Sequence, residues 1–385
     1  MNGPGRIVMV AGEPSGDRHG ALLARALKAT PGLADLALEG IAGPAMRAAG
    51  VRPLARMEDV AVVGFAEVLG HLPALLAARR AIDAALAAPG ARLFLPIDFP
   101  GFNLPLAKQA HRRGVPVLQY VAPQVWAWGR GRLAALRRDI DRLAVILPFE
   151  EAWFREHGVA ATFVGHPLLD GLEPARDRAT FARETGLDAA APWLALLPGS
   201  RDQEVARHAD PLLGAFAALR RERPEARAIV AAASPAHRAR LEAAVPAGER
   251  PYVRVVEDGT REALAFARAA LVASGTATLE CGALGTPLVV LYRMATVSHA
   301  IARRVVKLQR FGLVNIVAGE DVAPELLQAE VTPERILSAL LPLWDDGAPR
   351  AAARARLERV RGLLGTPGAS TRVAALAAAL IAERA

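Results

Sequence analysis

The stretch LVASGTATLECGALGTPLVVLYR, residues 271–293, decides the fold expected for this chain. It predicts a strand, a tight turn at Ser274, Gly275 and Thr276, a helix, a Gly-Pro break and a second strand. A helix that begins at such a turn offers backbone N–H groups and a positive dipole end, which attract phosphate. Glu280, further along the helix, could accept hydrogen bonds from a sugar diol. The stretch suggests a nucleotide or nucleotide-sugar site; an ordinary βαβ unit with a serine cap is the alternative.

Two successive arrays of short apolar runs, alternating with Ala- and Arg-rich segments, predict two Rossmann-like, doubly wound α/β domains. A length of 385 residues also fits two domains. The predicted strands are 6–11, 36–41, 93–97, 115–121, 143–147 and 161–164, then 193–197, 227–232, 252–256, 270–273 and 288–292.

The domain boundary is expected near residues 171–178, where proline and charge interrupt the pattern. The expected domains are 1–170 and 171–365. A final helix in 366–385, after a break at Gly365-Thr366-Pro367-Gly368, is expected to pack back on the first domain. Ligands of doubly wound domains bind beyond the carboxyl ends of the strands, so we expect the site in a cleft between the domains.

Composition limits the classes of function. Hydrophobic residues make up 52% of the chain and the formal net charge is +8. The basic charge is nearly all arginine, dispersed among acidic residues, so we expect no nucleic-acid partner. The single cysteine, Cys281, excludes intrachain disulfides and cysteine zinc clusters, and no other spacing suggests a metal site. Without an apparent signal peptide or membrane span, the chain is expected to be cytoplasmic, with any membrane contact peripheral.

Polar side chains follow two predicted strands of the first domain. The loop Gly12-Glu13-Pro14-Ser15-Gly16-Asp17 is neither a dinucleotide fingerprint nor a Walker loop. Ser15 and Asp17 therefore either cap the next helix or touch substrate hydroxyls. Asp98 stands at a strand end between apolar residues, where burial would raise its pKa and make it a base near neutral pH. The alternative for Asp98 is a turn or a helix cap.

Aromatic and basic residues mark two further loops. The segment 120–128, YVAPQVWAW, contains Trp126 and suits either a wall against a sugar or lipid chain, or core packing. In the second domain, Gly199, Ser200 and Arg201 follow a strand, and offer backbone donors and a guanidinium to phosphate oxygens. A surface arginine near a turn is the alternative there.

Residues 62–76 form a predicted helix with one apolar face, followed by Arg79 and Arg80. From the pattern alone a core-facing helix is favoured over one that dips into lipid. The apolar face consists of Phe65, Val68, Leu69, Leu72, Leu75 and Leu76.

Taken together, these motifs resemble the lipid-A-disaccharide synthases, inverting GT-B glycosyltransferases of lipopolysaccharide assembly. The matching segments are AGEPSGD (11–17), IDFPGFN (97–103), YVAPQVWAW (120–128), FVGHPLLD (163–170), LLPGSR (196–201), ASGTATLE (273–280) and NIVAG (315–319). The sequence departs from the family pattern at Pro14, His19, Val314 and the stretch Gly129-Arg130-Gly131-Arg132. These departures affect loop stiffness or acceptor fit and remove no proposed functional side chain.

The resemblance implies a reaction without cofactor or metal. The donor UDP-2,3-diacylglucosamine transfers its sugar to 2,3-diacylglucosamine 1-phosphate, giving a β-1,6-linked disaccharide 1-phosphate and UDP. It also implies work at the cytoplasmic face of the inner membrane, and it favours the lipid-facing interpretation of residues 62–76. A homodimer is an open possibility, as is another GT-B transferase or epimerase acting on a related UDP-sugar or lipid-linked sugar.

Roles follow from the resemblance residue by residue. Asp98 is the expected base and Arg201 stabilises the leaving diphosphate. The expected UDP and donor site consists of Gly199, Ser200, Arg201, Ser274, Gly275, Thr276, Glu280 and Asn315. The expected acceptor side of the cleft consists of Ser15, Asp17, Asn103, Gln124 and Trp126.

Overall fold

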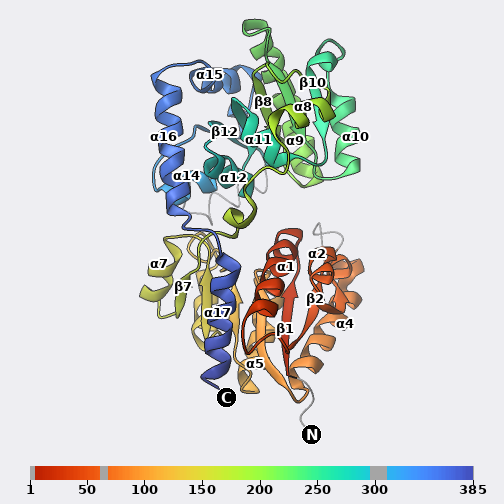
Figure 1. Cartoon of the computed structure of the whole chain (residues 1–385), viewed down its shortest axis with the longest axis vertical. Coiled ribbons are helices and arrows are strands. Elements are labelled where there is room, and N and C mark those ends of the chain that lie inside the picture. The colour runs from red at the N-terminus through yellow and green to blue at the C-terminus, as the bar shows by residue number, and fades with distance from the viewer. Residues whose placement is uncertain (1–4, 61–67, 295–309, 385) are drawn as a thin grey trace. The chain divides into compact units, whose positions relative to one another are not determined.

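The structure, a computed structural model, describes residues 5–60, 68–294 and 310–384, without the side chains of 68–71. The chain divides into two compact units (Figure 1). Unit 1 comprises residues 1–170 and 365–385, and unit 2 comprises residues 171–364. Each unit is a parallel sheet with helices on both faces.

Unit 1 contains a seven-stranded sheet in the order β3-β2-β1-β4-β5-β6-β7. The chain winds from β1 outward through β2 to β3, then returns and winds the other way from β4. The order therefore reverses between β1 and β4, which pair in parallel with Ala11 beside Ile97. The strands are β1 (Arg6–Ala11), β2 (Ala37–Ala42), β3 (Arg52–Arg56), β4 (Ala91–Ile97), β5 (Leu118–Tyr120), β6 (Arg142–Val145) and β7 (Ala161–Phe163).

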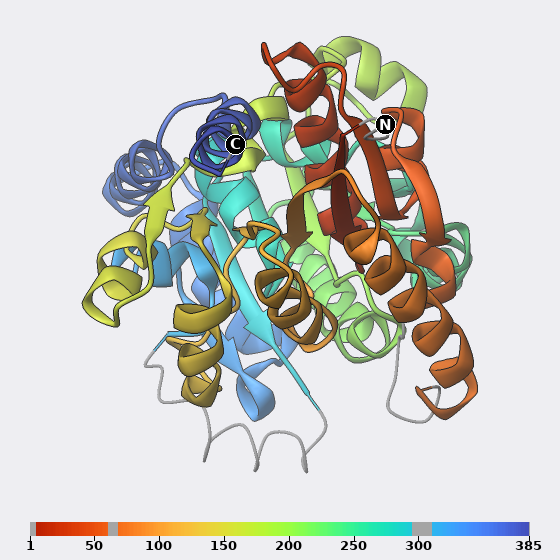
Figure 2. The same cartoon turned by 90° about the horizontal axis from the view of Figure 1, so that it is seen from below.

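Two apolar clusters cover the two faces of this sheet. Alternate residues of β1 enter different clusters: Ile7 and Met9 pack with α1 and α17, and Val8 and Val10 pack with α4 and α5. Figure 2 shows these helices on opposite sides of the sheet. The helices of unit 1 are α1 (Pro14–Ala29), α2 (Pro44–Ala48), α3 (Met57–Val60), α4 (Val68–Ala87), α5 (Pro100–Arg112), α6 (Leu133–Asp139), α7 (Glu150–Glu156) and α17 (Ala369–Ala382).

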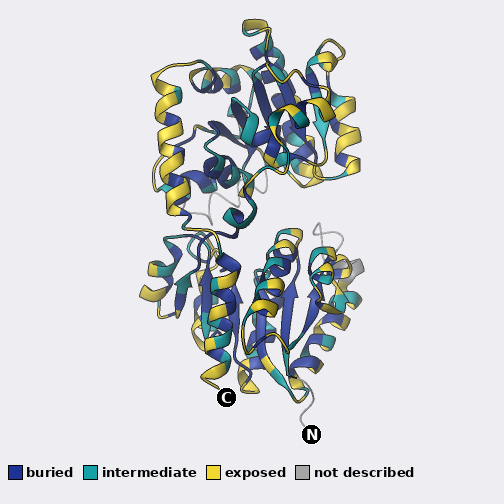
Figure 3. Cartoon of the chain, in the orientation of Figure 1, coloured by how far each residue is buried: buried dark blue, intermediate teal, exposed yellow. Residues whose placement is uncertain are grey.

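Unit 2 repeats the plan with a six-stranded sheet, in the order β10-β9-β8-β11-β12-β13. Here the order reverses between β8 and β11. The strands are β8 (Trp193–Leu197), β9 (Arg227–Ala231), β10 (Val253–Val256), β11 (Ala269–Ala273), β12 (Leu288–Tyr292) and β13 (Glu325–Leu327). The helices are α8 (Arg178–Thr185), α9 (Asp202–Glu222), α10 (Pro235–Ala244), α11 (Thr260–Phe266), α12 (Thr276–Leu284), α14 (Leu313–Ala318), α15 (Pro333–Trp344) and α16 (Ala348–Leu363). Figure 3 shows the central strands buried and the outer face of α16 exposed.

The sequence pattern located the buried strands and missed two edge strands. The ranges 6–11, 193–197 and 288–292 are strands with the predicted bounds. The pattern missed β3, which is half exposed and contains Pro53, and β13, which has three half-buried residues. Edge strands need neither a continuous apolar run nor strict alternation, because only one side of each is paired.

The chain's last helix belongs to unit 1. Helix α17 packs against α1 and buries Val373, Ala374, Ala377 and Leu380. Its start is held by polar contacts: the Gly368 N–H donates to Asp170 Oδ1, and Arg372 Nε donates to the Val164 carbonyl at 2.7 Å. These contacts tie the returning segment to the last residues of the first part of unit 1.

The predicted helix 62–76 is only partly within the described residues. Helix α4 begins at Val68, and Phe65 lies outside the described part. Of the predicted apolar face, Leu72 and Leu76 are 46% and 44% exposed. Leu75 packs against the core. The described part of the face is therefore divided between core and solvent.

We expect Leu380→Ala to destabilise unit 1 by about 2–5 kcal/mol, because it empties a buried site under α17. Leu363→Ala is the matched control, since Leu363 is 44% exposed and the change should stay within about 0.5 kcal/mol. Urea unfolding measures the stability of each variant, and hydrogen exchange of the α1 amides assigns the change to unit 1. Equal stabilities for the two variants would contradict this packing of α17.

Candidate active site

The points where strand order reverses select four loops, each of which carries one of the sequence motifs. In open α/β sheets, ligands bind beyond the carboxyl ends of the strands at such a point. In unit 1, β1 is followed by the loop with Gly12, and β4 by Asp98. In unit 2, β8 is followed by the loop with Gly199, and β11 by the turn at Gly275. Each unit thus presents one candidate half-site of its own.

Asp98 lies in an unusual backbone conformation. Asp98 and Phe99 have φ angles of +48° and +52°, in the left-handed region of backbone conformation that residues other than glycine rarely adopt. The carbonyl of Asp98 accepts from Asn103 Nδ2 at 2.7 Å and from Gln119 Nε2 at 3.3 Å. Its N–H donates to the Tyr120 carbonyl at 2.9 Å. Strain of this kind persists only where surrounding contacts impose it, and it is concentrated at functional sites.

The electrostatics of Asp98 suit a base. Burial raises its pKa to about 6, and the nearby Glu13 carboxylate adds to the shift. A base with this pKa is ionised at neutral pH yet still binds a proton better than a solvated carboxylate does.

The first loop packs directly on the Asp98 loop. A Cβ at Gly12 would lie 2.3 Å from the ring of Phe99, so only glycine allows this contact. Helix α1 then begins at Pro14, and its N-cap, Glu13, makes no side-chain cap. Of the two alternatives for Ser15, capping of α1 is therefore wrong; Ser15 is half-buried in the first turn of α1.

Asp17 and Asn103 are buried residues that bind backbone groups. Asp17 is 4% exposed, and its carboxylate accepts from the N–H groups of Ala45 and Met46 at the start of α2. Asn103 is fully buried and holds the Asp98 carbonyl. Contrary to the expectation from sequence, neither side chain is placed to touch an acceptor directly.

The aromatic loop after β5 contains one side chain that is held in place, Trp126, and two that are exposed, Gln124 and Trp128. Gln124 is exposed. Trp126 is half-buried: its indole N–H donates to Glu150 Oε1 at 2.9 Å, and its ring meets Phe149 edge-on at 5.0 Å. Trp128 is 44% exposed and stacks under Arg132. The loop thus combines a fixed ring with accessible polar and aromatic side chains.

In unit 2, the donors of the loop after β8 are already engaged by a carboxylate. Glu204 Oε2 accepts from the N–H groups of Ser200 at 2.9 Å and Arg201 at 3.2 Å. The Arg201 guanidinium donates to Glu204 Oε1 at 3.1 Å. Gly199 has φ +116°, and a Cβ there would collide with Glu204. The loop therefore binds one internal anion in the manner expected for a phosphate.

The turn at the start of α12 is open by comparison. The N-cap is Gly275, and a Cβ there would meet no described atom within 4 Å. Thr276 is exposed and Glu280 is half-buried. Ser274 is not the cap, because its hydroxyl donates to the Phe311 carbonyl at 3.0 Å. The open first turn, with helix N–H groups that have no acceptor within the helix, retains the geometry of an anion site.

Asn315 organises the segment after α14. It is fully buried, and its Nδ2 donates to the Ala323 carbonyl and to Glu325 Oε1, both at 2.8 Å. Its Oδ1 accepts from the N–H groups of Val322 and Ala323. With both ends of the amide engaged, Asn315 is a structural support, in contrast to the expected contact with the donor.

Sequence reasoning missed Tyr292 and His208. Burial raises the pKa of Tyr292, and Glu204 and Arg201 both act on it, which places the phenol beside the loop after β8. His208 Nδ1 donates to the Glu204 carbonyl at 2.8 Å, and Nε2 accepts from the Arg293 N–H at 3.0 Å. Burial lowers the pKa of His208. Because Nε2 accepts a hydrogen bond, the ring in this bridge is the neutral tautomer with its proton on Nδ1. The position of Tyr292 at the end of a strand was the one signal available in the sequence.

In residues 5–60, 68–294 and 310–384, no group of three or more His, Cys, Asp and Glu side chains could hold a metal ion. Within the same ranges, no helix combines the length and apolarity needed to cross a membrane.

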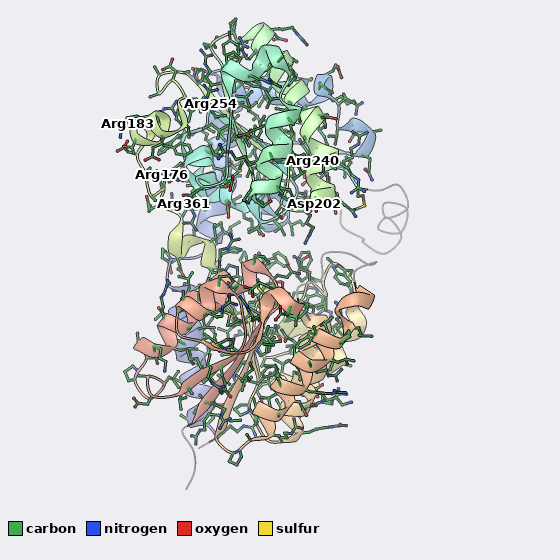
Figure 4. The ribbon with its side chains drawn as sticks, turned by 90° about the vertical axis from the view of Figure 1, so that its right-hand side faces the viewer. Arg176, Arg183, Asp202, Arg240, Arg254 and Arg361 are labelled. Carbon is green, nitrogen blue, oxygen red and sulfur yellow. The ribbon has the colours of Figure 1, made fainter. Side chains whose placement is uncertain are left out.

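A groove of about 750 Å³ lies elsewhere in unit 2, along β10 at the sheet edge. Of its arginines, Arg176 pairs with Glu184 and Glu262, and Arg238 pairs with Glu242. Figure 4 shows Arg176 and Arg254 on one side of the unit and Asp202, next to Arg201 in the chain, on the other. The residues that line the groove include none from the loops after β8 and β11, so the groove is separate from the loops at the reversal point.

Solved structures with the same fold define the class. One is the calicheamicin glycosyltransferase CalG4, with a TM-score of 0.60 at 20% identity, over 99% of both chains. Another is UDP-GlcNAc 2-epimerase from Neisseria meningitidis bound to UDP-GlcNAc, with a TM-score of 0.57 at 10% identity, over 98% of both chains. The two parallel-sheet units are those of the GT-B fold.

The sequence comparisons are more specific. The family model described as lipid-A-disaccharide synthetase matches residues 7–378. Lipid-A-disaccharide synthases of Syntrophus aciditrophicus and Myxococcus xanthus are 41% and 42% identical, each over 97% of both chains. This chain belongs to the lipid-A-disaccharide synthetase family. It is accordingly a glycosyltransferase of lipid A biosynthesis, and the family implies a UDP-sugar donor and a lipid acceptor.

We expect Asn315→Asp to destabilise unit 2 by about 2–5 kcal/mol at neutral pH. The change removes a buried donor and places a second carboxylate against Glu325. Gln203→Glu is the control, because it makes the same chemical change at an exposed position of α9 and should stay within about 0.5 kcal/mol. Denaturant unfolding measures both. A stable Asn315→Asp variant would contradict the supporting role of Asn315.

Proposed function

We propose that this protein transfers 2,3-diacylglucosamine from UDP-2,3-diacylglucosamine to the 6-hydroxyl of 2,3-diacylglucosamine 1-phosphate. The products are the β-1,6-linked disaccharide 1-phosphate and UDP. The observation that carries the proposal is the placement of Asp98 in unit 1 and of Arg201 and Thr276 in unit 2 at the two reversal points. The reaction requires one group that removes a proton and another that stabilises a departing diphosphate, and the two half-sites supply these separately.

Asp98 is the proposed base. Inversion at the anomeric carbon needs one displacement, in which the acceptor hydroxyl attacks as UDP leaves. An ionised carboxylate, whose pKa burial has raised to about 6, takes the hydroxyl proton as the new bond forms. The hydrogen bonds from Asn103 and Gln119 go to the backbone carbonyl of Asp98, so the side-chain carboxylate keeps its capacity to accept.

The diphosphate is proposed to bind at the start of α12 and at Arg201. The open turn at Gly275 and Thr276 supplies helix N–H groups, and Arg201 supplies a guanidinium. The Arg201 side chain is 67% exposed even while it pairs with Glu204, so a phosphate oxygen can reach it. Glu280, half-buried in the same helix, is proposed to bind the ribose diol.

The acyl chains of both substrates call for a membrane-facing surface. Each buried CH₂ contributes about 0.8 kcal/mol, so sugars with two acyl chains stay in the bilayer. Helix α4 exposes Leu72 and Leu76 to solvent and carries Arg79 and Arg80 two turns or less further on. We propose that this face contacts the cytoplasmic leaflet of the inner membrane, with the arginines near anionic headgroups.

Asp98→Asn should lower disaccharide formation by about 10²–10⁴-fold, because it removes the proton acceptor while keeping the size of the side chain. In the unaltered protein, kcat/KM should fall as the pH drops through about 6, since Asp98 gains a proton there. The matched control is Asp35→Asn, which makes the same chemical change at an exposed position. Asp139 is unsuitable as a control because it forms a salt bridge with Arg138.

The assay measures UDP and disaccharide with and without the acceptor. A loss smaller than tenfold in Asp98→Asn would exclude Asp98 as the base. UDP release or sugar epimerisation that does not depend on the acceptor would instead indicate a hydrolase or an epimerase, and would contradict the proposed function.

Replacing Leu72 and Leu76 together by Gln should reduce binding to vesicles of phosphatidylethanolamine and phosphatidylglycerol several-fold, because the apolar contact is lost. Leu363→Gln, in α16, is the control with a similar exposure of 44%. Sedimentation with vesicles gives the bound fraction, and circular dichroism confirms folding. Unchanged binding of the double variant would contradict the proposal that this face of α4 contacts the membrane.

A further inference from the structure

Glu150 is a buried carboxyl that the proposed chemistry does not use. It is the first residue of α7 and is 2% exposed. Burying a carboxyl is unfavourable unless its oxygens find partners. Both oxygens of Glu150 do so: Oε1 accepts from the Trp126 indole N–H at 2.9 Å, and Oε2 accepts from the Leu147 N–H at 3.1 Å.

The topology brings Glu150 to the same edge of the sheet as Asp98. Strands β4, β5 and β6 are consecutive neighbours and run parallel. Asp98 follows β4, Trp126 lies in the loop after β5, and Glu150 starts the helix after β6. Carboxyl ends of adjacent parallel strands meet at one edge, so these three side chains belong to three neighbouring loops.

The ring of Trp126 is held from two sides by the third of these loops. Its N–H donates to Glu150, and its ring makes a T-shaped contact with Phe149 at an interplanar angle of 84°. Trp126 is in turn the anchored ring of a loop whose other polar side chain, Gln124, is exposed. Losing the Glu150 contact would free the loop on the side where the acceptor is proposed to bind.

We propose that Glu150 is a positioning residue for the acceptor: its carboxyl fixes Trp126 and the loop after β5 at the edge of the sheet that carries Asp98. The effect on the acceptor rests on the proposed function, whereas the contact with Trp126 does not.

Both carboxyls have raised pKa values. Burial raises the pKa of Glu150 to about 7, the hydrogen bond from Trp126 opposes the shift, and the Asp98 charge adds to it. Burial raises the pKa of Asp98 to about 6, and Glu13 adds to that shift. Asp98 therefore loses its proton at a lower pH than Glu150 does.

The decisive variant is Glu150→Gln, which keeps the size but cannot ionise and sets an amide N–H₂ against the Leu147 N–H or the indole. Its neighbour Glu151→Gln is the matched control, since Glu151 pairs at the surface with Arg155. We expect Glu150→Gln to raise the acceptor KM about tenfold with the donor KM unchanged. We also expect the kcat/KM profile to lose its ionisation near pH 7 and to keep the one near pH 6. Glu151→Gln should match the unaltered protein in both respects.

A second measurement needs no turnover and separates this inference from the proposed reaction. Titration of tryptophan fluorescence from pH 5 to 9 should show a transition near pH 7 that disappears in both Glu150→Gln and Trp126→Phe. That result would support the Glu150–Trp126 contact even if the protein made no disaccharide. If Glu150→Gln fails to fold, Trp126→Phe removes the same hydrogen bond and should raise the acceptor KM in its place.

The inference is overturned if folded Glu150→Gln keeps the acceptor KM and both ionisations of the unaltered protein. It is also overturned if the donor and acceptor KM rise equally, because a general loss of structure would do that and a positioning role would not.

Discussion

The candidate site depends on one topological constraint, the reversal of strand order within each parallel sheet. Right-handed crossovers place successive helices on one face until the chain returns to the centre and winds the other way. At that point the two adjacent loops diverge to opposite faces and leave room at the strand ends. The reversal falls at β1/β4 in unit 1 and at β8/β11 in unit 2. Every segment that we assign to chemistry begins at one of these four strand ends or at a neighbour.

The loops differ in how firmly their backbone is held and in which groups they leave open to a ligand. Around Asp98 the backbone is over-determined: Asn103 and Gln119 bind the carbonyl, and Tyr120 accepts from the N–H. This leaves the carboxylate as the group that can react. At the start of α12 the backbone N–H groups are the proposed ligands of the diphosphate, and an open turn suits that role. A rigid base and an exposed set of helix donors are the complementary requirements of the proposed proton removal and phosphate binding.

The sequence was sufficient for the α/β class and most buried strands, because long apolar runs between turn signals have few other structures available to them. It was less informative about supports. Asp17, Asn103 and Asn315 look like ligands in a motif, yet each is buried and hydrogen-bonded to backbone groups, and Asn315 also donates to the Glu325 carboxylate.

The reason is physical. Asp and Asn in a tight loop bind neighbouring N–H and carbonyl groups as readily as a substrate, and the sequence does not say which. Glu150 shows the converse: an acidic residue at the start of a short helix reads as an ordinary first-turn carboxylate. Its burial and its bond to Trp126 depend on two loops that only the folded sheet brings together.

Glu204 competes with a bound diphosphate at the donor half-site, because it accepts from the Arg201 guanidinium and from two N–H groups of the same loop. The contact with the guanidinium is weak. Arg201 is two-thirds exposed, and an exposed ion pair of this kind contributes about 0–1 kcal/mol. A diphosphate carries more charge and more acceptor oxygens than one carboxylate, so it can take over the guanidinium at little cost. Meanwhile Glu204 keeps the loop after β8 ordered when no nucleotide is bound, through its hydrogen bonds to the N–H groups of Ser200 and Arg201. A weakly bound internal carboxylate is therefore compatible with a phosphate site. Because it already orders the loop, binding of the diphosphate loses less conformational entropy.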